Sequence, residues 1–142
     1  MKILLAVDGS KHSLNAVKCL IEHADWYRKS PAVTLAHVCP PVPRIGGMNA
    51  VISASQIRHY YDSEGKAALS KARKLLDAAG IRYSAHNFVG PIAETLLKEA
   101  RLARCDLIMI GARGATALSN LLLGSTASKL MSLSTIPVLV VK

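Results

Sequence analysis

The sequence has few cysteines and few aromatic residues, and both shortages exclude classes of protein. Its three cysteines, Cys19, Cys39 and Cys105, show neither CxxC nor Cys/His spacing, so no zinc-site pattern is present. An odd number of cysteines is typical of reduced thiols in a reducing compartment. One Phe and one Trp leave little surface on which bases could stack, which argues against a platform for single-stranded nucleic acid.

Long hydrophobic runs are also missing, although 51% of the residues are hydrophobic. The runs are a few residues long, and the first of them, residues 3–7, stops at Asp8-Gly9-Ser10. Such runs are too short for a transmembrane helix or a signal peptide, so we expect a cytoplasmic protein. At 142 residues we expect one domain, residues 1–142, that is large enough to bury a core.

Familiar catalytic patterns are absent as well. No G-x4-G-K-[ST] motif supplies a phosphate-binding lysine, and the five histidines show no ligand spacing. A phospho-accepting receiver domain needs an acidic cluster after its first strand and an Asp after its third. Here only Asp8 follows the first predicted strand, and the third ends in Phe88-Val89-Gly90. The sequence therefore predicts no defined catalytic residue.

Positive charge is in excess, with 18 basic against 9 acidic residues and a net charge of +9. Such an excess favours binding to polyanions. The basic residues are scattered from Lys2 to Lys142, and only residues 71–74 form a short cluster. We interpret most of this charge as solvated helix faces and keep a basic protein that binds nucleic acid or an anionic surface as an alternative.

Strand and helix patterns alternate along the whole chain. Apolar and β-branched runs predict strands at 3–7, 32–38, 81–89, 107–110 and 136–141. Helical periodicity predicts helices at 12–27 and 53–79, a third that starts with Pro91 as its first residue, and a fourth from about residue 125. This alternation predicts an α/β fold with an open parallel sheet and helices on both faces. The Pro- and Gly-rich residues 39–52 are predicted to be an irregular flap or a mobile segment.

The strongest functional pattern lies in residues 106–126. An apolar strand stops at Gly111, Gly114 follows, and Gly124-Ser125-Thr126 is typical of a helix start with a hydroxyl N-cap. Glycines permit close backbone approach, and helix N-termini present unpaired N–H groups to anions. The pattern predicts a phosphate-binding loop, with a loop that merely turns tightly as the alternative. If the fourth strand lies beside the first, Asp8 and Gly111 meet at the switch point of the sheet.

The last predicted strand has the composition of a sheet edge. Pro137 removes a backbone donor, which suits an edge position. Residues 138–141 are all apolar, and such an edge invites aggregation unless it is covered. Pairing with a second copy would cover it, so we predict a twofold homodimer through residues 136–141, from Ile136 onward.

These features together resemble one protein family. The G-x2-G-x9-G-S-T signature, the opening strand ILLAVDGS, the strand that ends in His37-Val38 and the closing IPVLVV are similar to the ATP-binding branch of the universal stress protein family. The resemblance covers the whole chain and implies a five-stranded sheet of order 3-2-1-4-5. It implies an ATP-binding regulator or sensor in the stress response, commonly dimeric, without an established reaction. A slow ATPase on the same scaffold stays as an alternative.

The resemblance also implies roles for single residues. Asp8 would approach the ribose hydroxyls or a phosphate-bound Mg²⁺, with a local turn as the alternative. Val38 would read the adenine edge through its backbone, and Arg113 would either reach a phosphate or be solvated. Lys129 is expected on a solvated face. The other implied nucleotide-binding residues are Ala6, Ile110 and Gly111 around the base and ribose, and Gly114, Gly124, Ser125 and Thr126 around the phosphates. In residues 115–123, a short helical turn is predicted to bury Leu118, Leu121 and Leu122.

Overall fold

A computed structural model describes residues 1–27, 29–42, 53–115 and 122–142 of the chain. Its centre is a five-stranded parallel sheet of order β3-β2-β1-β4-β5, which confirms the predicted α/β fold and strand order. The strands are β1 Lys2–Ala6, β2 Ala32–Cys39, β3 Tyr83–Val89, β4 Leu107–Gly111 and β5 Val138–Val141.

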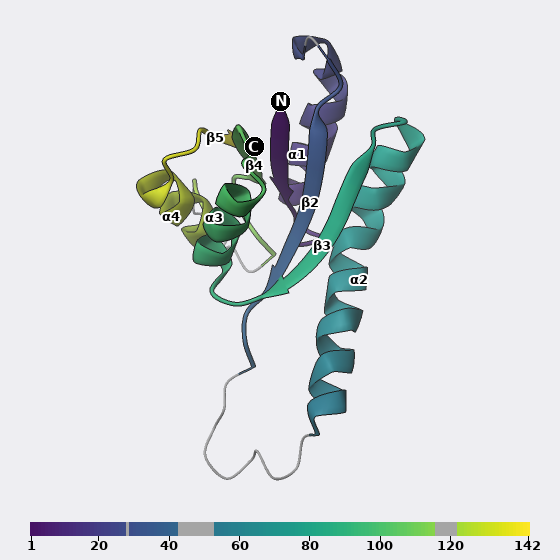
Figure 1. Cartoon of the computed structure of the whole chain (residues 1–142), viewed down its shortest axis with the longest axis vertical. Helices are drawn as coiled ribbons and strands as arrows, with labels where there is room; N and C mark the ends of the chain where they lie inside the picture. The colour runs from purple at the N-terminus through teal and green to yellow at the C-terminus, as the bar shows by residue number, and fades with distance from the viewer. Residues whose placement is uncertain (28, 43–52, 116–121) are drawn as a thin grey trace.

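Helices cover both faces of the sheet (Figure 1). Helices α1 (Lys11–Glu22) and α2 (Ala54–Ala78) pack on one face, and α3 (Ile92–Leu102) and α4 (Ser125–Leu133) pack on the other. The first turns of α2 extend beyond the end of the sheet in Figure 1. Within the described ranges, no helix combines the length and the apolar character needed to cross a membrane.

Strand β1 lies at the centre of the molecule. The side chain of Leu4 faces the α3/α4 layer, while Ile3 and Leu5 face the α1/α2 layer, and all three are fully buried. A central parallel strand is apolar on both faces, which explains the uninterrupted run in the sequence. The two edges are β3, as its alternating polar pattern predicts, and β5.

Several predicted boundaries differ from the structure. Helix α1 ends at Glu22 rather than at residue 27, because His23 caps it and its ring bonds to the Cys19 carbonyl; a short 3-10 turn, η1 (Ala24–Trp26), follows. Strand β3 starts at Tyr83, because the Ile81 N–H still bonds to the Leu76 carbonyl at the end of α2.

At the other helix and strand ends, the predicted and observed boundaries differ less. Pro91 is the N-cap of α3 rather than its first residue, and β5 starts after Pro137. The start of α2 is fixed by a capping box between Ser53 and Gln56. The predicted helix end at residue 79 is one residue late, because Ala79 is the C-cap of α2.

Candidate functional site

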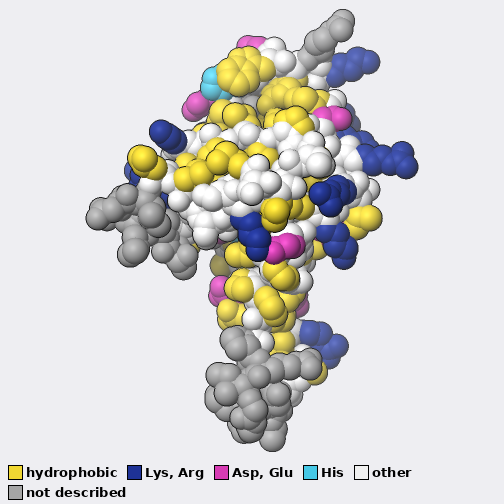
Figure 2. All heavy atoms as spheres, turned by 90° about the vertical axis from the view of Figure 1, so that its left-hand side faces the viewer, with side chains coloured by type: hydrophobic (Ala, Val, Ile, Leu, Met, Phe, Trp, Pro, Cys, Tyr) yellow, Lys and Arg dark blue, Asp and Glu magenta, His cyan; other side chains and the backbone are white. Residues whose placement is uncertain are grey.

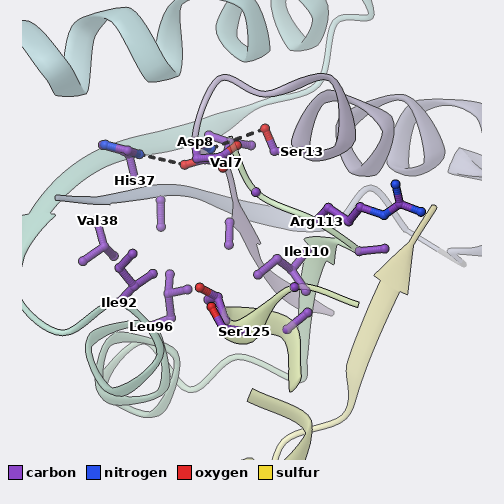
Figure 3. Close-up of a pocket in the computed structure, with 18 residues that line it drawn as sticks. Val7, Asp8, Ser13, His37, Val38, Ile92, Leu96, Ile110, Arg113 and Ser125 are labelled. Atoms are coloured by element: carbon purple, nitrogen blue, oxygen red, sulfur yellow. Dashed lines mark hydrogen bonds between the residues drawn. The ribbon is translucent and has the colours of Figure 1, made fainter. Parts of the chain in front are cut away.

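A pocket of about 260 Å³ opens where the carboxyl ends of β1 and β4 meet, which is the switch point of the sheet (Figure 3). One half of it is apolar and the other half is built from the glycine segment and the start of α4. All ten residues assigned from the sequence line it: Ala6, Asp8, Val38, Ile110, Gly111, Arg113, Gly114, Gly124, Ser125 and Thr126.

Asp8 joins the end of β1 to the glycine segment after β4. Its Oδ1 accepts a hydrogen bond from the Ser10 N–H at 3.0 Å, and its Oδ2 accepts one from the Ala115 N–H at 2.8 Å. Burial alone would raise the pKa of this carboxyl, but the hydrogen bonds from Ser10, Ser13 and Ala115 outweigh burial and lower it. Asp8 is therefore ionised at neutral pH and acts only as an acceptor.

Gly111 allows β4 to approach the first turn of α1. A Cβ at this position would lie 2.4 Å from the His12 carbonyl oxygen and 2.7 Å from the Ser13 nitrogen. Both neighbours are backbone atoms, so no side-chain movement could relieve the clash. This contact places the first turn of α1, and with it the Asp8 loop, against the end of β4.

Gly124 brings the start of α4 onto the turn after β4. Its N–H bonds to the Ala112 carbonyl at 2.7 Å, and a Cβ there would lie 3.3 Å from the Arg113 Cα. Gly124 is itself the N-cap, and no side chain caps this helix, which corrects the predicted hydroxyl cap. The hydroxyl groups of Ser125 and Thr126 belong instead to the first turn.

The first turn of α4 points unpaired donors at the pocket. The first bond within the helix runs from the Ser128 N–H to the Gly124 carbonyl, so the N–H groups of the three residues before Ser128 have no partner in the helix. Those residues are Ser125, Thr126 and Ala127, and all three line the pocket. Backbone donors and the positive end of the helix dipole suit an anion.

The apolar half of the pocket lies between β2, β4 and α3. Ile92 and Leu96 of α3 lie near Val38 in Figure 3. Ala6 and Ile110 also line this half of the pocket. The sequence had placed Ile92 and Leu96 only on a helix, because their position over the strand ends depends on how α3 packs. Ser13 of α1 and His37 of β2 also line the pocket and were missed as pocket residues, because only the folded sheet brings α1 and β2 to the same site.

Three further side chains near the loop were assigned from the sequence: Lys129 to a solvated face, Arg113 to a phosphate or to solvent, and Leu122 to a buried turn. Lys129 pairs with Glu94 of α3 at the surface and does not line the pocket. The side chain of Arg113 points away from Ser125 toward β5 (Figure 3). Leu122, predicted to be buried, is 79% exposed, while Leu118 and Leu121 lie outside the described residues. Most of the predicted flap at residues 39–52 also lies outside the residues that the structure describes.

Charge and metal-binding groups around the site are sparse. In the described part of the chain, no group of three or more His, Cys, Asp or Glu side chains is placed to hold a metal ion. On the face formed by α3 and α4, Lys and Arg side chains are spread out among hydrophobic ones (Figure 2). The positive charge of that face is therefore dispersed.

The order of the sheet and the pocket at its switch point define an open α/β protein with a pocket beyond the strand ends. The model of the universal stress protein family matches residues 1–142, and the chain belongs to that family.

Individual relatives agree with this assignment. The chain is 33% identical over 142 residues to universal stress protein MJ0531 of Methanocaldococcus jannaschii, covering 99% of this chain and 81% of that one. The solved structure of MJ0577 from the same organism superposes with a TM-score of 0.82 at 28% identity, covering 99% and 94% of the two chains. A universal stress protein from Archaeoglobus fulgidus in complex with dAMP matches with a TM-score of 0.70 at 21% identity, covering 100% and 98%.

Proposed function

We propose that this protein binds an adenine nucleotide, ATP with its Mg²⁺, in the pocket between β1 and β4 and acts as a nucleotide-dependent regulator or sensor in the stress response. One observation carries the proposal: the pocket joins an apolar slot beside Val38 to a set of backbone donors at the start of α4. A base and a phosphate chain need these two surfaces at opposite ends of one site.

The backbone of Val38 is directed into the pocket. In a parallel strand alternate residues direct their N–H and C=O groups to opposite sides. The Ala36 carbonyl bonds toward β1 and the Cys39 carbonyl toward β3, so the Val38 groups face the β1 side. Strand β1 ends at Ala6, and among the described residues the Val38 N–H and C=O have no backbone partner. An adenine edge offers one donor and one acceptor to such a pair.

The charged half of the site fits the remainder of the nucleotide. The N–H groups of Ser125, Thr126 and Ala127 suit phosphate oxygens. The ionised Asp8 would repel a bare phosphate, and it suits either ribose hydroxyl donors or Mg²⁺. Mg²⁺ would neutralise part of the phosphate charge. The relative from Archaeoglobus fulgidus in complex with dAMP has the same fold, which supports a nucleotide in this family.

We place the protein in the cytoplasm as a homodimer joined at β5. The residues of β5 are only partly buried in the single chain, and β5 is a sheet edge. Beside it, Met131 of α4 is 51% exposed and borders a shallow hollow with Pro137. A second copy would cover this apolar edge. Analytical ultracentrifugation at micromolar concentration should show a dimer, and a monomer would contradict the assignment.

Identification of the nucleotide is the direct experiment. The purified protein is denatured, and any released nucleotide is identified by mass spectrometry; calorimetry then compares ATP, AMP and GTP. We expect adenine nucleotides to bind and GTP to bind at least about tenfold more weakly, since a guanine edge reverses the donor and acceptor that Val38 meets.

Variants locate the site. Gly124→Val would push the start of α4 off the turn at residues 112–114 and should abolish binding. Ala67→Val puts the same branched side chain on the exposed face of α2 and should leave binding unchanged. Equal binding by both variants would place the nucleotide elsewhere.

A further inference from the structure

The pairing of β1 with β2 stops one hydrogen bond early. The two strands are in register up to Ala6 and Ala36, and the Val7 N–H still bonds to the Ala36 carbonyl at 2.9 Å. In a parallel ladder the next bond runs from the N–H two residues further along β2, which is that of Val38, to the carbonyl of Val7. Among the described residues that bond is missing.

The Val7 carbonyl has another donor instead. Nδ1 of His37 lies 2.8 Å from this oxygen, as the dashed line in Figure 3 marks. A carbonyl oxygen only accepts, so Nδ1 carries the proton of the ring. The donor that would have extended the ladder has thus been replaced by the side chain of the preceding residue.

The second nitrogen of the His37 ring also has a close contact. Nε2 of His37 lies 3.4 Å from Sγ of Cys39, which is buried. Burial raises the pKa of the Cys39 thiol, so it keeps its proton at neutral pH and can donate it to Nε2 or to Oδ1 of Asn87, which lies 3.8 Å away. Contacts at both nitrogens fix the orientation of the ring and keep Nδ1 directed at Val7.

We propose that His37 is a positioning residue for the base. Its imidazole donates a hydrogen bond to the Val7 carbonyl in place of the Val38 N–H, which ends the β1–β2 ladder. The Val38 N–H is therefore left unpaired at the pocket. This inference rests on the proposed function for the identity of the ligand. The ladder itself can be tested without any ligand. His37 acts through the backbone of Val38, so its removal should affect recognition of the base and leave phosphate binding unchanged.

Two substitutions separate these effects. His37→Leu removes the donor at the δ position, whereas His37→Asn keeps an N–H donor close to where Nδ1 lies. In the leucine variant the Val38 N–H is free to bond to Val7, so its amide should exchange with solvent at least about tenfold more slowly than in the wild type, measured by NMR without ligand. The asparagine variant should exchange like the wild type.

Calorimetry with two probes completes the test. For His37→Leu we expect the Kd for ATP to rise about tenfold or more and the Kd for inorganic tripolyphosphate, which has no base, to change less than about twofold. His37→Asn should restore ATP binding. Unchanged exchange of the Val38 amide in the leucine variant, or equal losses with both probes, would overturn the role of His37.

The two proposals fail in different ways. A wild-type protein that bound no adenine nucleotide would overturn the proposed function, while the exchange rate of the Val38 amide would still decide whether His37 ends the ladder. If the leucine variant does not fold, His37→Gln makes the same comparison, because its amide lies one methylene beyond the δ position. Slow Val38 exchange in His37→Gln supports the role, and wild-type exchange overturns it.

Discussion

The carboxylate of Asp8 and the backbone N–H of Ala115 are joined by a hydrogen bond of 2.8 Å. Asp8 follows the first strand of the chain and Ala115 follows the fourth, so the bond forms only when these strands lie side by side in the sheet. The contact links the folding of the sheet directly to the assembly of the pocket.

Asp8→Asn should lower stability at neutral pH. Both carboxylate oxygens accept N–H groups, so the new amide NH₂ would face one of these donors. Because the site is only half-buried, solvent screening limits the expected loss to about 1 kcal/mol. Urea unfolding at pH 7 measures this loss.

The same substitution has a defined pH dependence. The pKa of Asp8 is lower in the folded protein than in the unfolded chain, so the ionised carboxylate stabilises the fold above about pH 4, and this stabilisation is lost as the pH falls through the lowered folded-state pKa. The difference in unfolding free energy between wild type and variant should therefore shrink when urea unfolding is repeated at successively lower pH below 4. A difference that grew in acid would contradict the assignment.

Gly111→Ala should destabilise the protein much more than Gly124→Ala. The new methyl group would lie 2.4 Å from the backbone oxygen of His12, whereas at Gly124 the nearest atom would be 3.3 Å away. We expect a loss of about 1–3 kcal/mol for the first substitution and a smaller one for the second. Chemical denaturation of both variants gives the comparison, and equal losses would show that α1 can move away from β4.

Lys129→Gln should have little effect on nucleotide binding. Its ammonium group pairs with Glu94, and both side chains are about half exposed, at 51% and 48%. An exposed pair of this kind contributes little to stability. Calorimetry with ATP should give a Kd within about twofold of the wild type, since Lys129 does not line the pocket. A large rise in Kd would show that the lysine leaves Glu94 for the phosphates.

The sequence was most informative where a residue type is tied to one kind of backbone structure, such as apolar residues in buried strands and glycines in close turns. The apolar strands and the alternation of elements led to the correct fold class, and the family resemblance supplied the strand order. The glycines of the 111–124 segment led to the pocket that Asp8 and Gly111 both line. Helix ends were harder, because α1 stops where the His23 ring competes for the Cys19 carbonyl, and no periodicity records such a bond.

Side-chain contacts between distant elements were also beyond sequence reasoning. From the sequence, His37 is interpreted as a hydrogen-bonded strand histidine rather than a residue beside the base; the structure shows both its bond to Val7 and its place in the pocket lining. Its effect on Val38 depends on the register of β1 against β2, which is a property of the folded sheet. Ile92 and Leu96 reach the pocket only through the packing of α3.

An NMR titration of the isotope-labelled protein with ATP and Mg²⁺ tests the central claim most directly. We expect the largest shifts at the backbone amides of Val38, of the Gly111–Ala115 turn and of the first turn of α4, with saturation at one equivalent per chain. Absence of shifts, or shifts confined to the exposed face of α2, would contradict an adenine-nucleotide site between β1 and β4.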